Sequence, residues 1–271
     1  MTDDRAADFN LLQETGREAA KLALSYSGRS IVQERKSDGS AVTEADKAVD
    51  ALLMERLRTA RPHYGWLSEE SAEHTERLTA RRVWVLDPID GTRAFIQGRD
   101  DWTVALALVE DGVPVLAVVI NPVRGEVYEA QAGKGAFLNG RRLLGSCRTE
   151  LSGARIALPE VGSKRWTPPK ALPHLKPVFA NSSIYRLALI ASDNADIALA
   201  VKPKWEWDVA AGALLVSEAG CSISDISGLP LKFNSPEAKV QGFLAGPPKL
   251  HQMLVEFWSG VPEGSAAAQR A

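Results

Sequence analysis

The stretch VWVLDPIDGT, residues 83–92, decides the fold of this chain. Its β-rich apolar half is typical of a buried strand and ends at Asp87, which Pro88 keeps in an extended conformation. A helix that runs through Phe95 is expected to begin directly after Asp90. Two carboxylates, those of Asp87 and Asp90, are therefore predicted at the corner between a strand and a helix.

Three further β-rich runs follow this corner, at residues 103–110, 113–120 and 125–130. The turn dipeptides Asp111-Gly112 and Asn121-Pro122 separate them, which indicates an antiparallel meander with short connections.

Two helices are predicted before the corner. Apolar residues recur at helical spacing from Ala6 to Tyr26. Thr43 is a candidate N-cap for a second helix that ends at Arg61, with Asp46 at the capping-box distance. Helices packed on an antiparallel sheet follow from these patterns.

The second half mixes strands and helices. It begins near Ala154 and has strands and helices at residues 154–159, 184–191, 195–201, 208–219, 221–226 and 240–246. The small residues 210–213 are expected to let their helix approach the sheet closely. We expect an N-terminal α+β subdomain over residues 5–150, a C-terminal α/β subdomain over 151–262, and a disordered tail over 263–271.

Composition narrows the class of protein. The chain has 271 residues with 32 basic and 34 acidic side chains, so its net charge of −2 argues against a nucleic-acid partner. It has 2 cysteines, too few for a disulfide framework, and no apolar segment of about 18 residues. The polar start MTDDRAADFN is unlike a signal peptide. These features predict a cytoplasmic protein without an integral membrane segment.

The acidic residues indicate chemistry. Asp-Pro-x-Asp-Gly alone is ordinary turn chemistry, but here it lies in a set with Glu69, in LSEES, and Asp208, in WDVAAG. Four converging carboxylates carry a charge of about −4, which is unfavourable unless cations neutralise them. Mg²⁺ prefers oxygen ligands and keeps several waters, so two or three protein oxygens per ion suffice.

The runs GSAVTEAD, LSEES, VWVLDPIDGTRAF, GEVYEAQAGKGAFLNG and EWDVAAGALLVSEAG resemble, in order and spacing, the inositol monophosphatase family. The resemblance covers about residues 6–255. It implies a layered αβαβα sandwich of the α+β class and an Mg²⁺-dependent, lithium-sensitive phosphomonoesterase that uses two or three ions. It also implies a small-molecule phosphate ester as substrate, with a homodimer as a further possibility.

The same resemblance assigns roles to individual residues. Metal ligands are expected among five positions: Glu69, Asp87, the carbonyl of Ile89, Asp90 and Asp208. Gly91 and Thr92 match phosphate-holding positions. Thr92 and Asp46, with Glu69, match the catalytic group that orients and deprotonates the attacking water. From position alone, Asp46 is equally well explained as a first-turn acid that the helix dipole favours.

The substrate is less sharply indicated. Inositol-specific members have an acid seven positions before the last metal aspartate, where this chain has Val201. This difference resembles the CysQ-type 3′(2′),5′-bisphosphate nucleotidases of sulfur metabolism, in which cations receive a second phosphate. The expected substrate contacts are Arg93, Ser182, Ser183, Arg186 and Lys202, although Ser182 and Ser183 are equally well explained as a helix cap. Alternatives are an inositol-1-monophosphatase, a histidinol-phosphate phosphatase, and a non-catalytic binding protein on the same fold.

Overall fold

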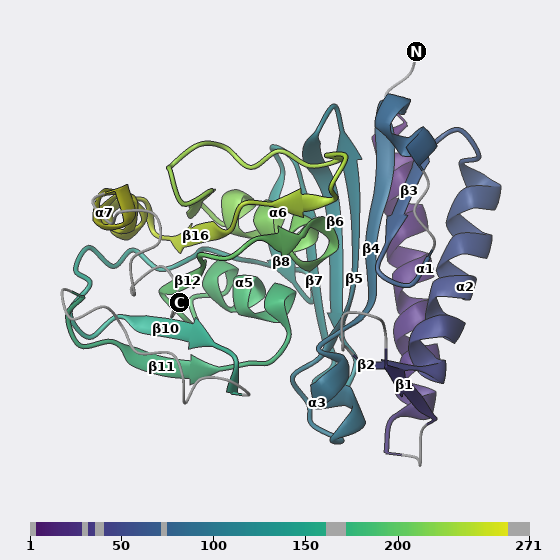
Figure 1. Cartoon of the computed structure of the whole chain (residues 1–271), viewed down its shortest axis with the longest axis horizontal. Coiled ribbons are helices and arrows are strands. Elements are labelled where there is room, and N and C mark those ends of the chain that lie inside the picture. The colour runs from purple at the N-terminus through teal and green to yellow at the C-terminus, as the bar shows by residue number, and fades with distance from the viewer. Residues whose placement is uncertain (1–3, 29–31, 36–40, 72–74, 161–171, 260–271) are drawn as a thin grey trace.

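The computed structural model describes residues 4–28, 32–35, 41–71, 75–160 and 172–259. Five layers follow one another across the molecule: the helix pair α1/α2, a seven-stranded sheet, the helix pair α5/α6, a five-stranded sheet and α7 (Figure 1). The expected αβαβα sandwich of the α+β class is confirmed. The tail predicted to be disordered, residues 263–271, lies outside the described residues.

The first layer is a pair of long helices, α1 (Arg5–Tyr26) and α2 (Glu44–Ala60). A capping box begins α2, because Asp46 Oδ2 accepts the Thr43 N–H at 2.8 Å while Thr43 Oγ1 accepts the Ala45 and Asp46 N–H groups. A short antiparallel pair, β1 (Gln33–Arg35) and β2 (Ala41–Thr43), leads into α2.

The seven-stranded sheet has the order β3-β4-β5-β6-β7-β8-β9. Its strands are β3 (Gly65–Ser68), β4 (Arg82–Asp90), β5 (Thr103–Glu110), β6 (Val113–Asn121), β7 (Glu126–Gln131), β8 (Gly135–Leu138) and β9 (Arg141–Arg142). The predicted meander is present from β4 onward. The prediction missed β3, which pairs parallel to β4 at the edge, and the 3₁₀ helix Thr75–Thr79 that follows it.

Strand β5 explains why the sheet is covered on both faces. All eight of its residues are buried. Val104, Leu106 and Leu108 pack towards α1 and α2, whereas Ala105 and Ala107 belong to the core shared with α5 and α6. Alternation of this kind follows from the two-residue period of a strand. The smaller alanines lie on the face that α6 covers.

The second half forms the other layers. Its strands are β10 (Arg155–Leu158), β11 (Lys176–Phe179), β12 (Ile197–Ala200), β14 (Ser222–Ser224) and β16 (Phe243–Gly246). A separate pair consists of β13 (Lys204–Trp205) and β15 (Lys239–Val240). The helices are α5 (Ser183–Ala191), α6 (Ala210–Glu218) and α7 (Pro248–Ser259).

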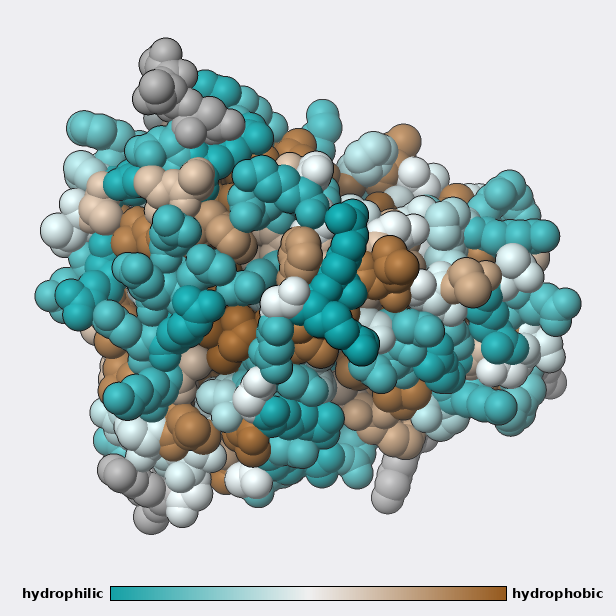
Figure 2. Space-filling model, turned by 180° about the vertical axis from the view of Figure 1, so that it is seen from behind, coloured by the Kyte–Doolittle hydropathy of each residue, from teal (hydrophilic) through white to brown (hydrophobic). Residues whose placement is uncertain are grey.

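Polar side chains cover most of the back of the molecule. Figure 2 shows the coloured residues of this face as mainly hydrophilic, with apolar atoms in separate groups. Within the described ranges, no helix is long and apolar enough to cross a membrane. Both cysteines, exposed Cys147 and buried Cys221, are free thiols.

Helix α6 approaches α5 closely at Gly212. A Cβ added there would lie 2.5 Å from Leu187 Cδ1 and 2.6 Å from Leu187 Cβ. The small residues at 210–213 were expected to serve the contact with the sheet. At Gly212 the close neighbour is instead a side chain of α5, the helix that lies beside α6 in the same layer (Figure 1).

Replacement of Gly212 by Ala is expected to lower the free energy of unfolding by about 1–3 kcal/mol, although alanine is the better helix former. The added methyl group overpacks the contact with Leu187. Urea denaturation measures the loss. Ser217→Ala, at an exposed position of the same helix, is the control and should change stability little. A Gly212→Ala protein as stable as wild type would contradict the close packing of α5 on α6.

Candidate active site

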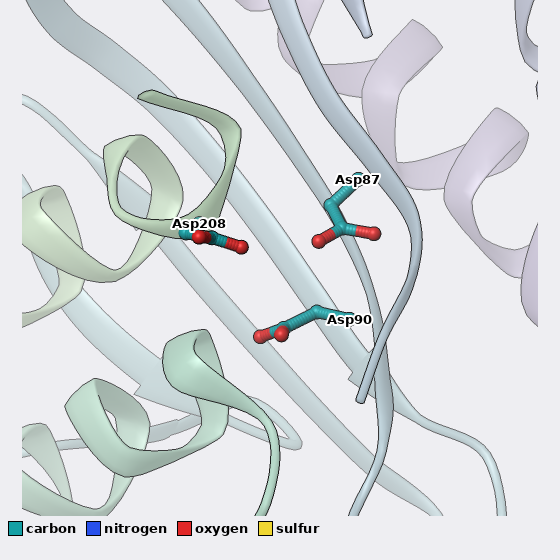
Figure 3. Close-up of side chains that lie close together, drawn as sticks. All are labelled: Asp87, Asp90 and Asp208. Atoms are coloured by element: carbon teal, nitrogen blue, oxygen red, sulfur yellow. The ribbon is translucent and has the colours of Figure 1, made fainter. Parts of the chain in front are cut away.

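The first two carboxylates come from an irregular end of β4. The pairing of β4 with β5 is regular up to Asp87, and its register shifts between Asp87 and Asp90. Gly91 follows in a left-handed conformation, with φ of 96°, and caps the short helix α3 (Thr92–Ile96). The bulge and the turn direct both aspartates to the same side of the sheet (Figure 3). Both lie at the corner between a strand and a helix, as the sequence predicted.

The start of α5 holds Asp90. Its carboxylate accepts hydrogen bonds from Ser182 Oγ at 2.6 Å, Ser183 N at 3.1 Å and Ile184 N at 2.6 Å. These donors lie at the helix N-terminus, where free N–H groups favour an anion. Ser182 also caps the helix by accepting the N–H of Tyr185, so the cap interpretation of this serine is confirmed.

Asp208 ends a 3₁₀ turn, Glu206–Asp208, that precedes α6. The sequence predicted one continuous helix from Asp208. The structure differs, because the 3₁₀ turn ends at Asp208 and α6 begins only at Ala210. The buried carboxylate of Glu206 anchors the turn, because it accepts the N–H groups of Asn234 at 2.6 Å and Ser235 at 2.8 Å. This anchor aims Asp208 at the end of β4 instead of along α6.

Asp87, Asp90 and Asp208 point toward one another across the gap between β4 and the start of α6 (Figure 3). One carboxylate oxygen from each residue lies within 4.8 Å of the others. Burial, followed by the charges of Glu69 and the other acids, raises the pKa of Asp87 well above its usual range. Burial and the charge of Asp90 raise the pKa of Asp208 to about 7. Burial also raises the pKa of Asp90, against the hydrogen bonds from α5.

This donor set fits a metal ion. Asp87 Oδ2 is buried and has no hydrogen-bond partner among the described residues, whereas Asp87 Oδ1 accepts the Ile89 N–H at 3.1 Å. A buried carboxylate oxygen without a donor is costly in an apolar setting and is satisfied by a cation. The three aspartates can therefore hold a metal ion with oxygen ligands.

Thr92 connects the acidic site to α2. Its Oγ1 lies 3.5 Å from Asp46 Oδ1 and donates to the Ile89 carbonyl at 3.1 Å. Asp46 has a second set of contacts through Oδ2, which accepts the Thr43 N–H and the Thr43 hydroxyl. Asp46 is therefore a capping residue through Oδ2 and a neighbour of Thr92 through Oδ1.

A pocket of about 290 Å³ opens over the carboxylates. Eight of its lining residues were predicted as site residues or lie beside them in the motifs: Glu69, Asp87, Asp90, Gly91, Thr92, Arg93, Ser183 and Asp208. The prediction missed three others, Ala41, Pro159 and Lys204, and nothing local distinguishes Lys204 from Lys202. Asn181, which directly precedes Ser182 and Ser183, also lines the pocket.

Two predicted substrate contacts are not supported by this geometry. Arg186 is 6% exposed, and its guanidinium donates to the carbonyls of Ala180 at 2.9 Å and Asn181 at 3.1 Å. Burial lowers its pKa, against the charges of Asp90 and Asp208. Arg186 is thus used inside the fold. Lys202 is exposed and lies outside the group of residues that lines the pocket.

Known proteins are similar in sequence to most of the chain. The inositol-1-monophosphatase of Rhizobium meliloti is 38% identical over 200 residues, which cover 71% of this chain and 75% of that protein. The histidinol-phosphatase of Chlorobaculum parvum is 35% identical over 230 residues, with 82% and 86% covered. The Nus factor SuhB of Xylella fastidiosa is 31% identical over 234 residues, with 81% and 82% covered.

Solved structures resemble it as well. The extragenic suppressor protein suhB of Bartonella henselae superposes with a TM-score of 0.81 at 26% identity and covers 94% of this chain and 100% of that one. A sequence profile described as the inositol monophosphatase family matches residues 5–259. The chain therefore belongs to the inositol monophosphatase family and is a phosphomonoester hydrolase.

Proposed function

We propose that this protein is an Mg²⁺-dependent phosphatase whose ions are held by Asp87, Asp90, Asp208, Glu69 and the Ile89 carbonyl. The observation that carries the proposal is the triad of buried Asp87, buried Asp90 and half-buried Asp208, which offer carboxylate oxygens within 4.8 Å of one another. Like charges at this separation are unfavourable without a cation. Magnesium suits an all-oxygen set with few protein ligands and several waters.

Different residues of the chain have different roles in the proposed hydrolysis. The N–H groups of Gly91 and Thr92, at the start of α3, would hold the phosphoryl group, and both residues line the pocket. Asp46 and Thr92 form the pair that orients the attacking water and accepts its proton, since Thr92 Oγ1 lies 3.5 Å from Asp46 Oδ1. When bound, the metal ions activate the water and stabilise the leaving oxygen.

Metal removal tests the proposal directly. Excess EDTA is expected to abolish phosphate release from small phosphomonoesters, and added Mg²⁺ should restore it, because the carboxylates alone repel a phosphate dianion. A malachite-green phosphate assay measures the rates. The control is the addition of Ca²⁺ in place of Mg²⁺, because Ca²⁺ is a larger ion with a different coordination. Release that persists undiminished in excess EDTA would defeat the proposal.

For the substrate, we infer a bisphosphate nucleotide such as adenosine 3′,5′-bisphosphate. Two cationic side chains line the pocket beside the carboxylates. They are the exposed Arg93 and the half-buried Lys204. Arg93 also lines an adjoining pocket of about 530 Å³ together with Arg35. A leaving group with a second phosphate would be attracted by these cations. Inositol-1-phosphate and histidinol phosphate are the alternatives, in keeping with the names of the relatives.

A comparison of kcat/KM on the three esters separates these substrates. With the bisphosphate as substrate, Arg93→Met is expected to lower kcat/KM by about 10-fold or more, as for loss of a charge-assisted contact of about 1.5–3 kcal/mol. With a monophosphate that has an uncharged leaving group, the loss should be smaller. Lys202→Met, outside the pocket, is the control. Equal losses on all esters would contradict the second-phosphate contact.

The cytoplasm is the proposed compartment, because both cysteines are free and one is exposed.

A further inference from the structure

Asp50, on the face of α2 one turn after Asp46, is a buried acid that the catalytic roles above do not use. Its side chain is 7% exposed. Its two carboxylate oxygens accept different hydroxyl groups: Oδ1 accepts that of Ser68 at 2.6 Å, and Oδ2 accepts that of Ser71 at 2.6 Å. Trp66 adds a third bond, from its Nε1 to Ser71 Oγ at 3.0 Å.

These bonds enclose Glu69. Ser68 is the last residue of β3, and Ser71 lies two residues beyond Glu69, so Asp50 fastens the segment on both sides of this glutamate. The backbone of Glu69 is tied to the sheet as well, because its N–H donates to the Leu86 carbonyl at 3.4 Å. Leu86 precedes Asp87, so these contacts set the distance between the two acids.

We propose that Asp50 is a positioning residue for the metal site, which acts by holding the segment 68–71 so that Glu69 faces Asp87 in the pocket. The inference rests on the proposed Mg²⁺-dependent function. Neighbours that orient a metal ligand contribute about 10–100-fold to metal affinity or activity. One face of α2 thus supplies Asp46 to Thr92 and Asp50 to the Glu69 segment.

Three variants of the full chain test this role. Asp50→Ala removes both acceptors, and calorimetric titration with Mg²⁺ should show a dissociation constant raised about 10–100-fold. Asp50→Asn removes the charge but keeps a group that can bond both serines, so it should recover most of that loss. Ser71→Ala breaks one bond without any change of charge and should weaken Mg²⁺ binding about threefold to tenfold. Glu55→Gln, at an exposed position of α2, is the control.

The outcomes are distinct. If Asp50→Ala does not fold, Ser71→Ala carries the test. Mg²⁺ dissociation constants within about twofold of wild type in the folded variants, together with a lower melting temperature of the metal-free protein, would show a purely structural role and overturn the inference. Asp50→Asn as weak as Asp50→Ala would also overturn it, because charge and not hydrogen bonding would then act. A wild-type protein that binds no Mg²⁺ would overturn the proposed function first, and this inference with it.

Discussion

Asp87→Asn is expected to lower kcat about 1,000-fold and, at the same time, to stabilise the metal-free protein. The first effect follows because Asp87 is the acid at the centre of the proposed metal set, and loss of metal-based stabilisation costs about 4 kcal/mol in the transition state. The second follows because the substitution removes a buried carboxylate. Burial and the charges of Glu69, Asp90 and Asp208 raise the pKa of this group.

The substitution is nearly isosteric. An asparagine keeps the oxygen that accepts the Ile89 N–H at 3.1 Å, and it places an amide donor where Oδ2 has no partner among the described residues. Urea denaturation in EDTA measures stability, and phosphate release in Mg²⁺ measures activity. Glu55→Gln removes an exposed negative charge and controls for net charge. An Asp87→Asn protein that is less stable in EDTA than wild type would contradict the electrostatic account of the triad.

The metal-free protein is expected to melt at a temperature at least about 4 °C lower at pH 8 than at pH 5, a shift that corresponds to roughly 1–2 kcal/mol for a chain of this size. Asp208 has a pKa raised to about 7, and those of Asp87 and Asp90 are raised as well. Between about pH 4 and pH 7 the folded protein therefore holds protons that the unfolded chain has lost, so stability falls as pH rises.

Other groups act in different pH ranges or with the opposite sign. The carboxylate of Asp196, whose pKa is lowered to about 2 against burial by hydrogen bonds from Arg155, changes stability only at lower pH. Burial lowers the pKa of His251, which makes the protein more stable as pH rises and opposes the expected trend. Asp87→Asn keeps His251 and removes one acid, so its pH dependence in EDTA should be flatter than that of wild type.

Calorimetric scans at the two pH values in EDTA, and again in Mg²⁺, measure the effect. Added Mg²⁺ should raise the melting temperature most at pH 8, where the carboxylates are ionised and bind the cation. A metal-free protein that is more stable at pH 8 than at pH 5 would contradict the raised pKa values of the triad.

Most of the first half of the fold was predictable because its signals are local. The 3.6-residue period marks α1 and α2, the capping box at Thr43 starts α2, and turn dipeptides separate β5, β6 and β7. Strand β3 was missed because four residues, Gly65–Ser68, are too few to show a period. Its parallel pairing with β4 is a long-range contact that no local pattern encodes.

The cations show the same division. Lys202 and Lys204 are two residues apart, so in an extended chain their side chains point to the same face and the sequence pattern does not distinguish them. The pairing of β13 with β15 places Lys204 beside Asp208, whereas Lys202 stays exposed. Arg186 has a guanidinium group, which commonly binds phosphate, but the side chain is buried in α5. Its N–H groups donate to backbone carbonyls just before that helix.

The sequence by itself determined the strand-to-helix corner at residues 83–92, the meander after it and the acidic motifs, because periodicity and turn chemistry are properties of short segments. The order of the layers was implied by the resemblance to the family. Only the tertiary structure decided which side chains meet. The oxygens of Asp87, Asp90 and Asp208 lie within 4.8 Å of one another because the turn before α6 packs against the end of β4. Asp90 and Asp208 are more than a hundred residues apart in the sequence, so only the packing between layers brings them together.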